Sequence, residues 1–251
     1  MASIPGTPAA VVSANNGVNV DFTWTAPASN GGTTITSYTL KIKTDSGSYV
    51  EDSVNCGTAN VLTCSVPMSV LIASPYLLDE GDLIVAQVFA TNAVGDSSVS
   101  TSNTVGAEVQ TIPATPTSAP TRNSATTATN IVVDIATVTA DGGSAITSYS
   151  IEYKISGGTY SSIKGSLSDD LLLTASQAVT SGSTYYFRYL AKNIYGWSSA
   201  SPEIEVLASV DPDAPTNVET ENVDAYLVVT WDAPVNTGGT GVALTSYRVT
   251  L

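Results

Sequence analysis

Alternating apolar and polar residues run through three similar stretches of the chain, and each stretch begins at paired glycines. In the first copy, Tyr38, Leu40 and Ile42 fall on one face of an extended strand, while Thr39 and Lys41 fall on the other. Such a period of two is typical of a β-strand that is buried on one side only. The pattern therefore predicts a glycine turn followed by a half-buried tyrosine strand. The three copies span residues 30–40, 141–151 and 237–249.

A second alternating run precedes each pair of glycines. In the first copy, Val18, Val20, Phe22 and Trp24 are expected to point inward from one strand, which an Ala-Pro pair ends. In the second copy, Ile135 stands in the place of Trp24. The matching inward sets are Ile131, Val133 and Ile135 in the second copy and Leu227, Val229 and Trp231 in the third.

More strands are expected after the tyrosine strand. The first copy predicts a strand over residues 65–71, a long strand over residues 84–90 and a last strand that ends near Val105. A hairpin at residues 92–97 has its counterpart at 193–198. Because equivalent tyrosines recur about one hundred residues apart, the chain reads as a repeat array. The inward sets of the long strands are Ile84, Ala86, Val88 and Ala90 in one copy and Tyr185, Phe187, Tyr189 and Ala191 in the other.

These patterns predict two complete modules, at residues 1–108 and 112–209, and the N-terminal strands of a third at residues 212–251. Pro113, Pro116 and Pro120 favour extended backbone, so the linker between the first two modules is expected to be a stiff spacer. Half a sandwich would expose an apolar face. We therefore expect the third module to be completed, either by later strands of a longer chain within a filament or by strands from another chain.

Together the motifs resemble those of fibronectin type III domains. The resemblance covers nearly the whole chain and rests on the proline-rich entry, Trp24 or Trp231, the Ala-Pro pair, the glycine pair and the Ile-Thr-Ser-Tyr motif. It implies an all-β fold of tandem seven-stranded, immunoglobulin-like sandwiches. It also implies that the Tyr185 hydroxyl bonds to backbone upstream, a bond that Ile84 cannot make at the equivalent position. No Arg-Gly-Asp occurs, so integrin binding is not implied.

Net charge and residue usage exclude several functions. A net charge of −14 with eight basic residues disfavours nucleic acid and anionic membrane surfaces as partners. The sequence holds no run long enough for a transmembrane helix. It also holds no histidine, which removes the commonest general base and histidine metal sites. We expect no enzyme, no cofactor and no metal site.

Two cysteines, Cys56 and Cys64, have the wrong spacing for a redox or zinc motif. We expect a disulfide that closes a short hairpin, which would place the protein in an oxidising compartment. Two reduced core thiols are the alternative. The resembled family does not carry this cysteine hairpin.

Clustered carboxylates have two interpretations. Asp169-Asp170 and Asp79-Glu80 sit beside predicted turns, so we interpret them as solvated turn residues rather than as a glycosidase pair. Calcium is an alternative at the Asp211-Pro212-Asp213 junction, although it needs six or more oxygen ligands. The other carboxylates that could contribute there are Glu203, Glu205, Glu219 and Asp224.

The linker and one hairpin carry candidate contact and modification sites. Tyr195 and Trp197 could stack on a sugar or on another chain, or Trp197 could pack at a module edge. No Asn-x-Ser/Thr sequon occurs. The linker reads equally as an O-glycosylated stretch or as a bare proline spacer. The candidate O-glycosylation sites are Thr111, Thr115, Thr117, Ser118 and Thr121.

Repeats without a catalytic constellation commonly act as spacers and contact surfaces. We therefore expect a non-catalytic structural or adhesive segment of an extracellular or cell-surface fibre. Its partners would be other protein chains, copies of itself among them, with no nucleic acid and no membrane insertion in this segment. The alternative is a ligand- or glycan-binding ectodomain, or accessory modules of a receptor or of a secreted polysaccharide-degrading enzyme.

Overall fold

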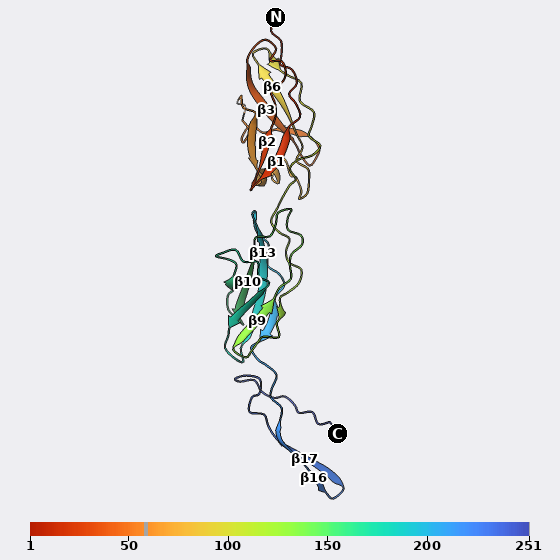
Figure 1. Ribbon diagram of the computed structural model, residues 1–251, viewed down its shortest axis with the longest axis vertical. Helices are drawn as coiled ribbons and strands as arrows, with labels where there is room; N and C mark the ends of the chain where they lie inside the picture. The colour runs from red at the N-terminus through yellow and green to blue at the C-terminus, as the bar shows by residue number, and fades with distance from the viewer. Residues whose placement is uncertain (58–59, 251) are drawn as a thin grey trace. The chain divides into compact units, whose positions relative to one another are not determined.

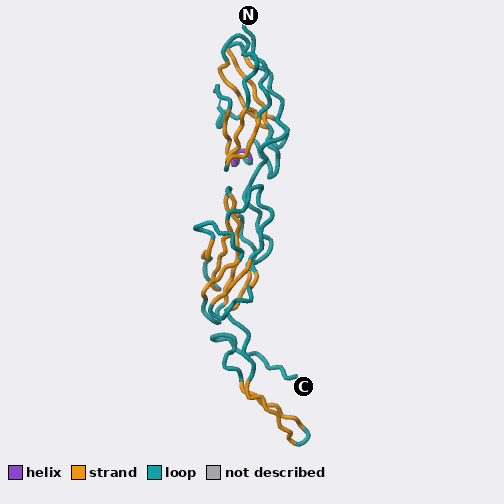
Figure 2. Tube along the Cα trace, viewed as in Figure 1, coloured by secondary structure: helices purple, strands orange, loops and turns teal. Residues whose placement is uncertain are grey.

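The computed structural model describes residues 1–57 and 60–250, and nearly all of its regular structure is β-strand (Figures 1 and 2). Packing divides the chain into two compact units. Unit 1 comprises Met1–Ile112, Ala140–Ala145 and Asn193–Gly196, and unit 2 comprises Pro113–Thr139, Ile146–Lys192 and Trp197–Leu251. Module boundaries at residues 108 and 209 remain a prediction.

Two antiparallel sheets form the first sandwich. One sheet has the order β1-β2-β5 and the other the order β4-β3-β6-β7. The strands of the first sheet are β1 (Val12–Asn16), β2 (Asn19–Thr23) and β5 (Thr63–Pro67). Those of the second are β3 (Ile35–Lys43), β4 (Tyr49–Glu51), β6 (Ala86–Asn92) and β7 (Gly95–Asp96).

Alternation places the core of the first sandwich as the sequence predicts. Val20 and Phe22 are fully buried and Trp24 is 6% exposed. All four inward residues predicted for the long strand are fully buried as well, although β6 begins at Ala86 and Ile84 lies just before it. The prediction that Val18 points inward is wrong, because this residue is 46% exposed. It lies in the turn between β1 and β2, outside the strand whose alternation it continues.

The strand expected over residues 65–71 is too long. β5 ends at Pro67, and α1 (Met68–Leu71) adds one helical turn. Met68 and Leu71 are both fully buried. Residues three apart share a face of a helix but not of a strand, so the helical turn lets both side chains reach the core.

A last strand ending near Val105 is also not observed, because β7 stops at Asp96 and no strand is assigned from there to Val105. Side chains instead bond the free edge of β6. The oxygens of Ser97, Ser100 and Asn103 accept the backbone N–H groups of Ala90, Val88 and Ala86, at 3.0, 3.0 and 2.7 Å. We call this arrangement the side-chain ladder. It satisfies buried donors that a paired strand would otherwise satisfy.

The second sandwich repeats the architecture. Its sheets have the orders β12-β9-β8 and β11-β10-β13-β14, with β15 also paired to β13. The first sheet contains β8 (Thr121–Arg122), β9 (Asn130–Asp134) and β12 (Thr174–Ala178). The second contains β10 (Ser148–Ile155), β11 (Ser161–Lys164), β13 (Thr184–Asn193), β14 (Gly196–Trp197) and β15 (Ile204–Leu207).

The core of the second sandwich also follows the predicted alternation. Ile135 is 6% exposed, the same as Trp24, which fits the predicted equivalence. The Tyr185 hydroxyl accepts the N–H of Thr180 at 2.9 Å, so the expected bond to upstream backbone is confirmed. Ser198 and Ser201 rebuild the side-chain ladder against β13.

The remaining strands form a two-stranded ribbon, β16 (Thr216–Val223) with β17 (Tyr226–Asp232), drawn in blue in Figure 1. The third tyrosine strand, expected around Tyr247, is not assigned as a strand. Its first two counterparts pair with β6 and β13, and no equivalent of those strands is present among the described residues. Without that partner the segment forms no backbone ladder.

Candidate contact surfaces

Each glycine pair holds the segment that enters its module. The N–H groups of Ser3, Thr111 and Val210 donate to the carbonyl oxygens of Gly31, Gly142 and Gly238, in each case at 2.8 Å. The three glycines have φ values of 74°, 74° and 106°, where L side chains are strained. A Cβ at Gly142 would lie 2.3 Å from the Thr111 carbonyl oxygen. Glycine is therefore required by both conformation and space, and we call this contact the clasp.

An asparagine amide reinforces the clasp in two copies. Asn92 Nδ2 donates to the carbonyl oxygens of Ser3 and Asn30, both at 2.8 Å. Asn193 Nδ2 donates to those of Thr111 and Asp141, both at 2.7 Å. Each asparagine follows the inward run of its long strand, so one side chain joins that strand to the entry segment and to the glycine loop.

Cys56 and Cys64 form a disulfide in the first sandwich, with an S–S distance of 2.16 Å. A carboxylate that no sequence motif marks organises this loop. Asp52 is 3% exposed and accepts the N–H of Asn55 at 2.7 Å and the hydroxyl of Tyr76 at 3.3 Å. Burial, and then the nearby Asp52 carboxylate, raises the pKa of Tyr76 well above its usual range. Tyr76 therefore stays protonated and donates its hydroxyl to Asp52.

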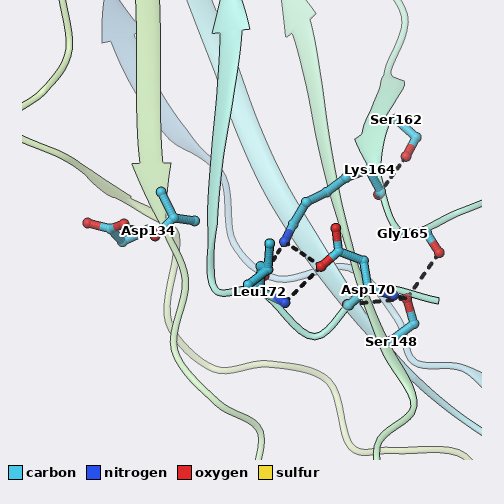
Figure 3. A network of polar contacts seen from close by, with 8 residues as sticks. Asp134, Ser148, Ser162, Lys164, Gly165, Asp170 and Leu172 are labelled. Atoms are coloured by element: carbon cyan, nitrogen blue, oxygen red, sulfur yellow. Dashed lines mark hydrogen bonds and ion pairs between the residues drawn. The ribbon is translucent and has the colours of Figure 1, made fainter. Parts of the chain in front are cut away.

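The equivalent loop of the second sandwich has no disulfide and is tied by charge instead (Figure 3). Lys164 Nζ lies 3.2 Å from Asp170 Oδ1 and also donates to the Leu172 carbonyl oxygen. The N–H of Leu172 donates to the Asp170 carboxylate at 2.8 Å, and the N–H of Asp170 donates to Ser148 Oγ at 3.0 Å. The Leu172 bond, followed by Lys164, holds the pKa of Asp170 below its usual range. The Asp170 carboxylate thus holds the loop together.

Aromatic rings and cations alternate on the outer face of the sheet that contains β10 and β13. The Arg188 guanidinium lies 3.7 Å from the centroid of the Tyr160 ring, and Lys154 Nζ lies 4.5 Å from it. Glu203 pairs with Lys154 at 3.1 Å and accepts the hydroxyl of Tyr160. Each cation is within reach of both a carboxylate and a ring, so the face is polar, aromatic and largely neutralised.

The two candidate contact aromatics differ in their surroundings. Tyr195 is half-buried within unit 1. Its hydroxyl donates a hydrogen bond to the Gly17 carbonyl oxygen at 3.0 Å and also lies 3.0 Å from Gln110 Oε1. Trp197 is half-buried in unit 2, and Lys192 Nζ lies 5.7 Å from its ring centroid.

The candidate O-glycosylation sites alternate with buried prolines. Pro113, Pro116 and Pro120 are buried, so the linker that was expected to be a stiff spacer packs against folded structure. The Thr111 hydroxyl donates to Glu80 Oε2 at 2.8 Å. The exposed hydroxyl residues of the linker are Thr115, Thr117, Ser118 and Thr121.

The acidic residues proposed for calcium are dispersed. Glu203 is engaged by Lys154, and Glu205 accepts the hydroxyl of Tyr186 at 3.1 Å. Across residues 1–57 and 60–250, no group of three or more histidine, cysteine, aspartate or glutamate side chains is placed to hold a metal ion. No helix in the same ranges is long and apolar enough to cross a membrane.

Comparison with known proteins gives no matching family model. Among solved structures, the chain is similar to domains A168–A170 of titin, with 15% identity, 82% of this chain and 61% of that chain covered, and a TM-score of 0.44. It is similar to the FN1–FN3 domains of chicken CNTN1, with 16% identity, 92% and 76% coverage and a TM-score of 0.35. The twitchin kinase region of C. elegans matches at 25% identity, with 39% and 17% coverage and a TM-score of 0.34.

The chain thus spans about 61% of the length of the titin structure. The argument for its fold comes from its own strands. In the first sandwich, a three-stranded sheet centred on β2 faces a sheet built around β3 and β6. In the second, a three-stranded sheet centred on β9 faces a sheet built around β10 and β13. That arrangement, with its corner tyrosine in the second copy, is the one that immunoglobulin-like domains share. The chain therefore folds as tandem immunoglobulin-like β-sandwiches.

Proposed function

We propose that the chain is a non-catalytic segment of an extracellular or cell-surface fibre, in which the sandwiches form a semi-rigid array of protein-contact modules. The clasp is the observation that carries this proposal, because the same 2.8 Å bond recurs at all three glycine pairs. Buried linker prolines add to it. A linker whose backbone is hydrogen-bonded and packed has fewer accessible conformations than a free one, so it resists bending.

A disulfide, exposed linker hydroxyls and an aromatic face support the proposed location and partners. A disulfide supports an oxidising compartment. Exposed linker residues leave Thr115, Thr117, Ser118 and Thr121 accessible for O-glycosylation. The neutralised aromatic face around Tyr160 suits contact with other protein chains, copies of this chain included, because aromatic residues and arginine are enriched at protein interfaces.

The stiffness of the array can be tested by single-molecule energy transfer between dyes at exposed Ser98 and Ser199. A narrow distance distribution is expected for the wild-type chain, and Gly142→Val should broaden it by breaking the clasp. Gly157→Val is the matched control, since Gly157 has a φ of 79° but a Cβ added there would meet no atom within 4 Å. A wild-type distribution as broad as that of Gly142→Val would contradict the proposal.

Surface labelling of intact cells tests the location.

A second candidate function is a ligand- or glycan-binding ectodomain, or an accessory role in a receptor or a secreted polysaccharide-degrading enzyme. The partly exposed ring of Trp197 favours it. Alanine substitutions at Tyr195 and Trp197, made separately, test it by glycan-array or partner binding. Loss of binding in Trp197→Ala alone would support this function, whereas unchanged binding would argue against it.

A further inference from the structure

Two asparagine–glycine pairs occur in the chain, Asn16-Gly17 and Asn30-Gly31, and both asparagines are exposed. In such a pair the backbone nitrogen of the glycine can attack the side-chain carbonyl carbon, Cγ, of the asparagine, because glycine has no side chain to crowd the approach. The attack closes a five-membered succinimide ring. The two dipeptides are identical, so any difference in their reactivity comes from the structure around them.

The first clasp loop supplies a hydrogen-bond donor to the reacting carbonyl of Asn30. Its Oδ1 atom accepts the N–H of Gly32 at 3.0 Å, so the side chain folds back over the backbone as an Asx turn. Oδ1 is also the atom on which negative charge develops when the Gly31 nitrogen adds to Cγ. A donor already aimed at that oxygen stabilises the intermediate, as the donors of an oxyanion hole do.

The other two reacting atoms of this pair are free of competing backbone bonds. The Gly31 nitrogen, which is the nucleophile, donates to Ser29 Oγ at 3.2 Å and takes no part in a strand ladder. Across residues 1–57 and 60–250, no acceptor binds Nδ2 of Asn30, which is the leaving group. Because Asn30 is exposed, water also reaches the ring once it has formed.

Asn16 has the reverse arrangement. Its Nδ2 atom donates to Asp21 Oδ2 at 2.7 Å, so a carboxylate holds the leaving group in place. Its backbone is also held, since it lies in β1 opposite Asn19 of β2. In the described part of the chain, no donor reaches Asn16 Oδ1. These contacts protect the Asn16-Gly17 pair from the reaction that the loop around Asn30 favours.

The other two clasp loops carry the same Asx turn on less reactive residues. Asp141 Oδ1 accepts the N–H of Gly143, and Asn236 Oδ1 accepts that of Gly238, both at 3.0 Å. An ionised carboxylate is a poor electrophile. Asn236 is followed by the β-branched Thr237, whose side chain crowds the attacking nitrogen. Of the three loops, the first alone combines the turn, a side-chain amide and an adjacent glycine.

We propose that Asn30-Gly31 is a deamidation site. The bond between the Gly31 nitrogen and Cγ forms as the Cγ–Nδ2 bond breaks, and Nδ2 leaves as ammonia with the proton of the Gly31 nitrogen. Water then opens the succinimide. Cleavage of the new bond to Cγ gives aspartate at position 30, whereas cleavage of the bond from the α-carbonyl carbon to the Gly31 nitrogen gives isoaspartate. Water is the only other reactant, and ammonia is the only other product.

The two products differ in their effect on the clasp. Asp141 is the equivalent residue of the second copy, where it keeps the turn and its backbone carbonyl oxygen accepts Asn193 Nδ2. Aspartate at position 30 therefore preserves the clasp. Isoaspartate routes the backbone through Cγ and converts the α-carbonyl that accepts Asn92 Nδ2 into a carboxylate outside the backbone. The added atom shifts Gly31 away from the Ser3 N–H, so this product releases the entry segment.

Incubation of the intact 251-residue chain at mildly alkaline pH, followed by peptide mapping with mass spectrometry, tests the site. In the folded chain Asn30 should deamidate about tenfold faster than Asn16 or more, because a donor on the developing oxyanion contributes at least one hydrogen bond to the transition state. In urea the two rates should converge. Asp21→Ala releases the amide of Asn16, so it should raise the rate at Asn16 and leave the rate at Asn30 unchanged.

Hydrogen exchange at the Ser3 N–H, measured by NMR, separates the two products. This N–H should stay protected in the variant Asn30→Asp and should lose its protection in the isoaspartyl fraction purified from aged protein. Three results would overturn the proposal: equal rates at Asn16 and Asn30 in the folded chain, aged protein without isoaspartate at position 30, or a Ser3 N–H equally protected in both products. The dye experiment on Gly142 does not involve Asn30, so it decides the array function separately.

Discussion

Ser97 and Ala90 form two hydrogen bonds with each other. The N–H of Ser97 donates to the Ala90 carbonyl oxygen at 2.8 Å, and the N–H of Ala90 donates to Ser97 Oγ at 3.0 Å. Ser198 and Ala191 repeat the arrangement at 2.8 and 3.1 Å. One serine thus satisfies both backbone groups of a buried alanine, so the hydroxyl has a structural role that an abundance of serine in the sequence does not reveal.

Replacing Ser97 by alanine should lower the free energy of unfolding by about 1–3 kcal/mol, because the buried N–H of Ala90 loses its acceptor. Urea denaturation measures the change. The matched control is Ser98→Ala, next along the chain and exposed, which should stay within about 0.5 kcal/mol of the wild type. Equal effects of the two substitutions would show that the hydroxyl of Ser97 is not structural.

Trp24→Ala should cost roughly 3–5 kcal/mol, because it leaves a large cavity between the two sheets. Trp24→Phe should cost much less. The indole N–H of Trp24 is buried and has no hydrogen-bond partner among the described residues, so phenylalanine removes a polar group without breaking a bond. Chemical denaturation compares the two. A loss below about 1 kcal/mol for Trp24→Ala would contradict the assignment of the strand.

Reducing the Cys56–Cys64 disulfide should raise the intact mass by two hydrogen atoms, which mass spectrometry detects directly. The cysteines are eight positions apart, so the double change to serine should cost about 2–3 kcal/mol by releasing the chain entropy of a short loop. Asp52 continues to bond the loop backbone in the variant. Two free thiols in the non-reduced protein would contradict the structure and weaken the extracellular proposal.

Asp170→Asn should remove about 1–2 kcal/mol of stability at pH 7, because the charged acceptor of the Leu172 N–H is lost. Folding lowers the pKa of Asp170. The stabilisation that the Asp170 carboxylate gives to the folded state is therefore complete above the unfolded pKa of about 3.9, and it is lost as the pH falls through the lower folded value. The difference between wild type and variant should therefore shrink below about pH 4. Denaturation across pH measures it, with exposed Asp169→Asn as the control. A difference that is constant with pH would rule out this role.

Gly142→Ala should destabilise the protein more than Gly157→Ala does. Both glycines have positive φ, so both variants share a backbone penalty of about 1–2 kcal/mol. Only at Gly142 would the new Cβ also collide with a carbonyl oxygen, that of Thr111. Thermal unfolding of the two variants side by side isolates the clasp. Equal melting temperatures would indicate that the entry segment moves aside freely.

Strand alternation predicted the fold well wherever the inward residues are large. The inward sets around Phe22, Val88 and Phe187 are buried because a period of two leaves no other face for them. The turn of α1 was not predictable, because Val66, Met68 and Val70 alternate as in a strand, and only Leu71, buried together with Met68, departs from that pattern. The correct choice depends on the shape of the core that both residues fill.

Polar residues were harder to interpret, because their partners are distant in sequence. Asp52 and Tyr76 are 24 positions apart, and Asn92 and Ser3 are 89 apart. No local spacing indicates such pairs. The repeat offers one signal: Asn92 and Asn193 occupy matching positions after the long strand, as do Ser97 and Ser198. Polar positions that match between copies therefore indicate the clasp and the side-chain ladder, in the same way that matching apolar positions indicate the core.

Tandem modules with similar strands risk pairing with the wrong copy, and an unpaired strand edge is where such mispairing starts. The side-chain ladder occupies backbone N–H groups of β6 that would otherwise be unpaired at such an edge. Its N–H groups at Ala86, Val88 and Ala90 are already bonded to side-chain oxygens, and the segment that supplies them is not a flat strand. We therefore expect Ser97, Ser100 and Asn103 to protect a repeated sequence from domain swapping and aggregation, a benefit separate from the stability of the sandwich that contains them.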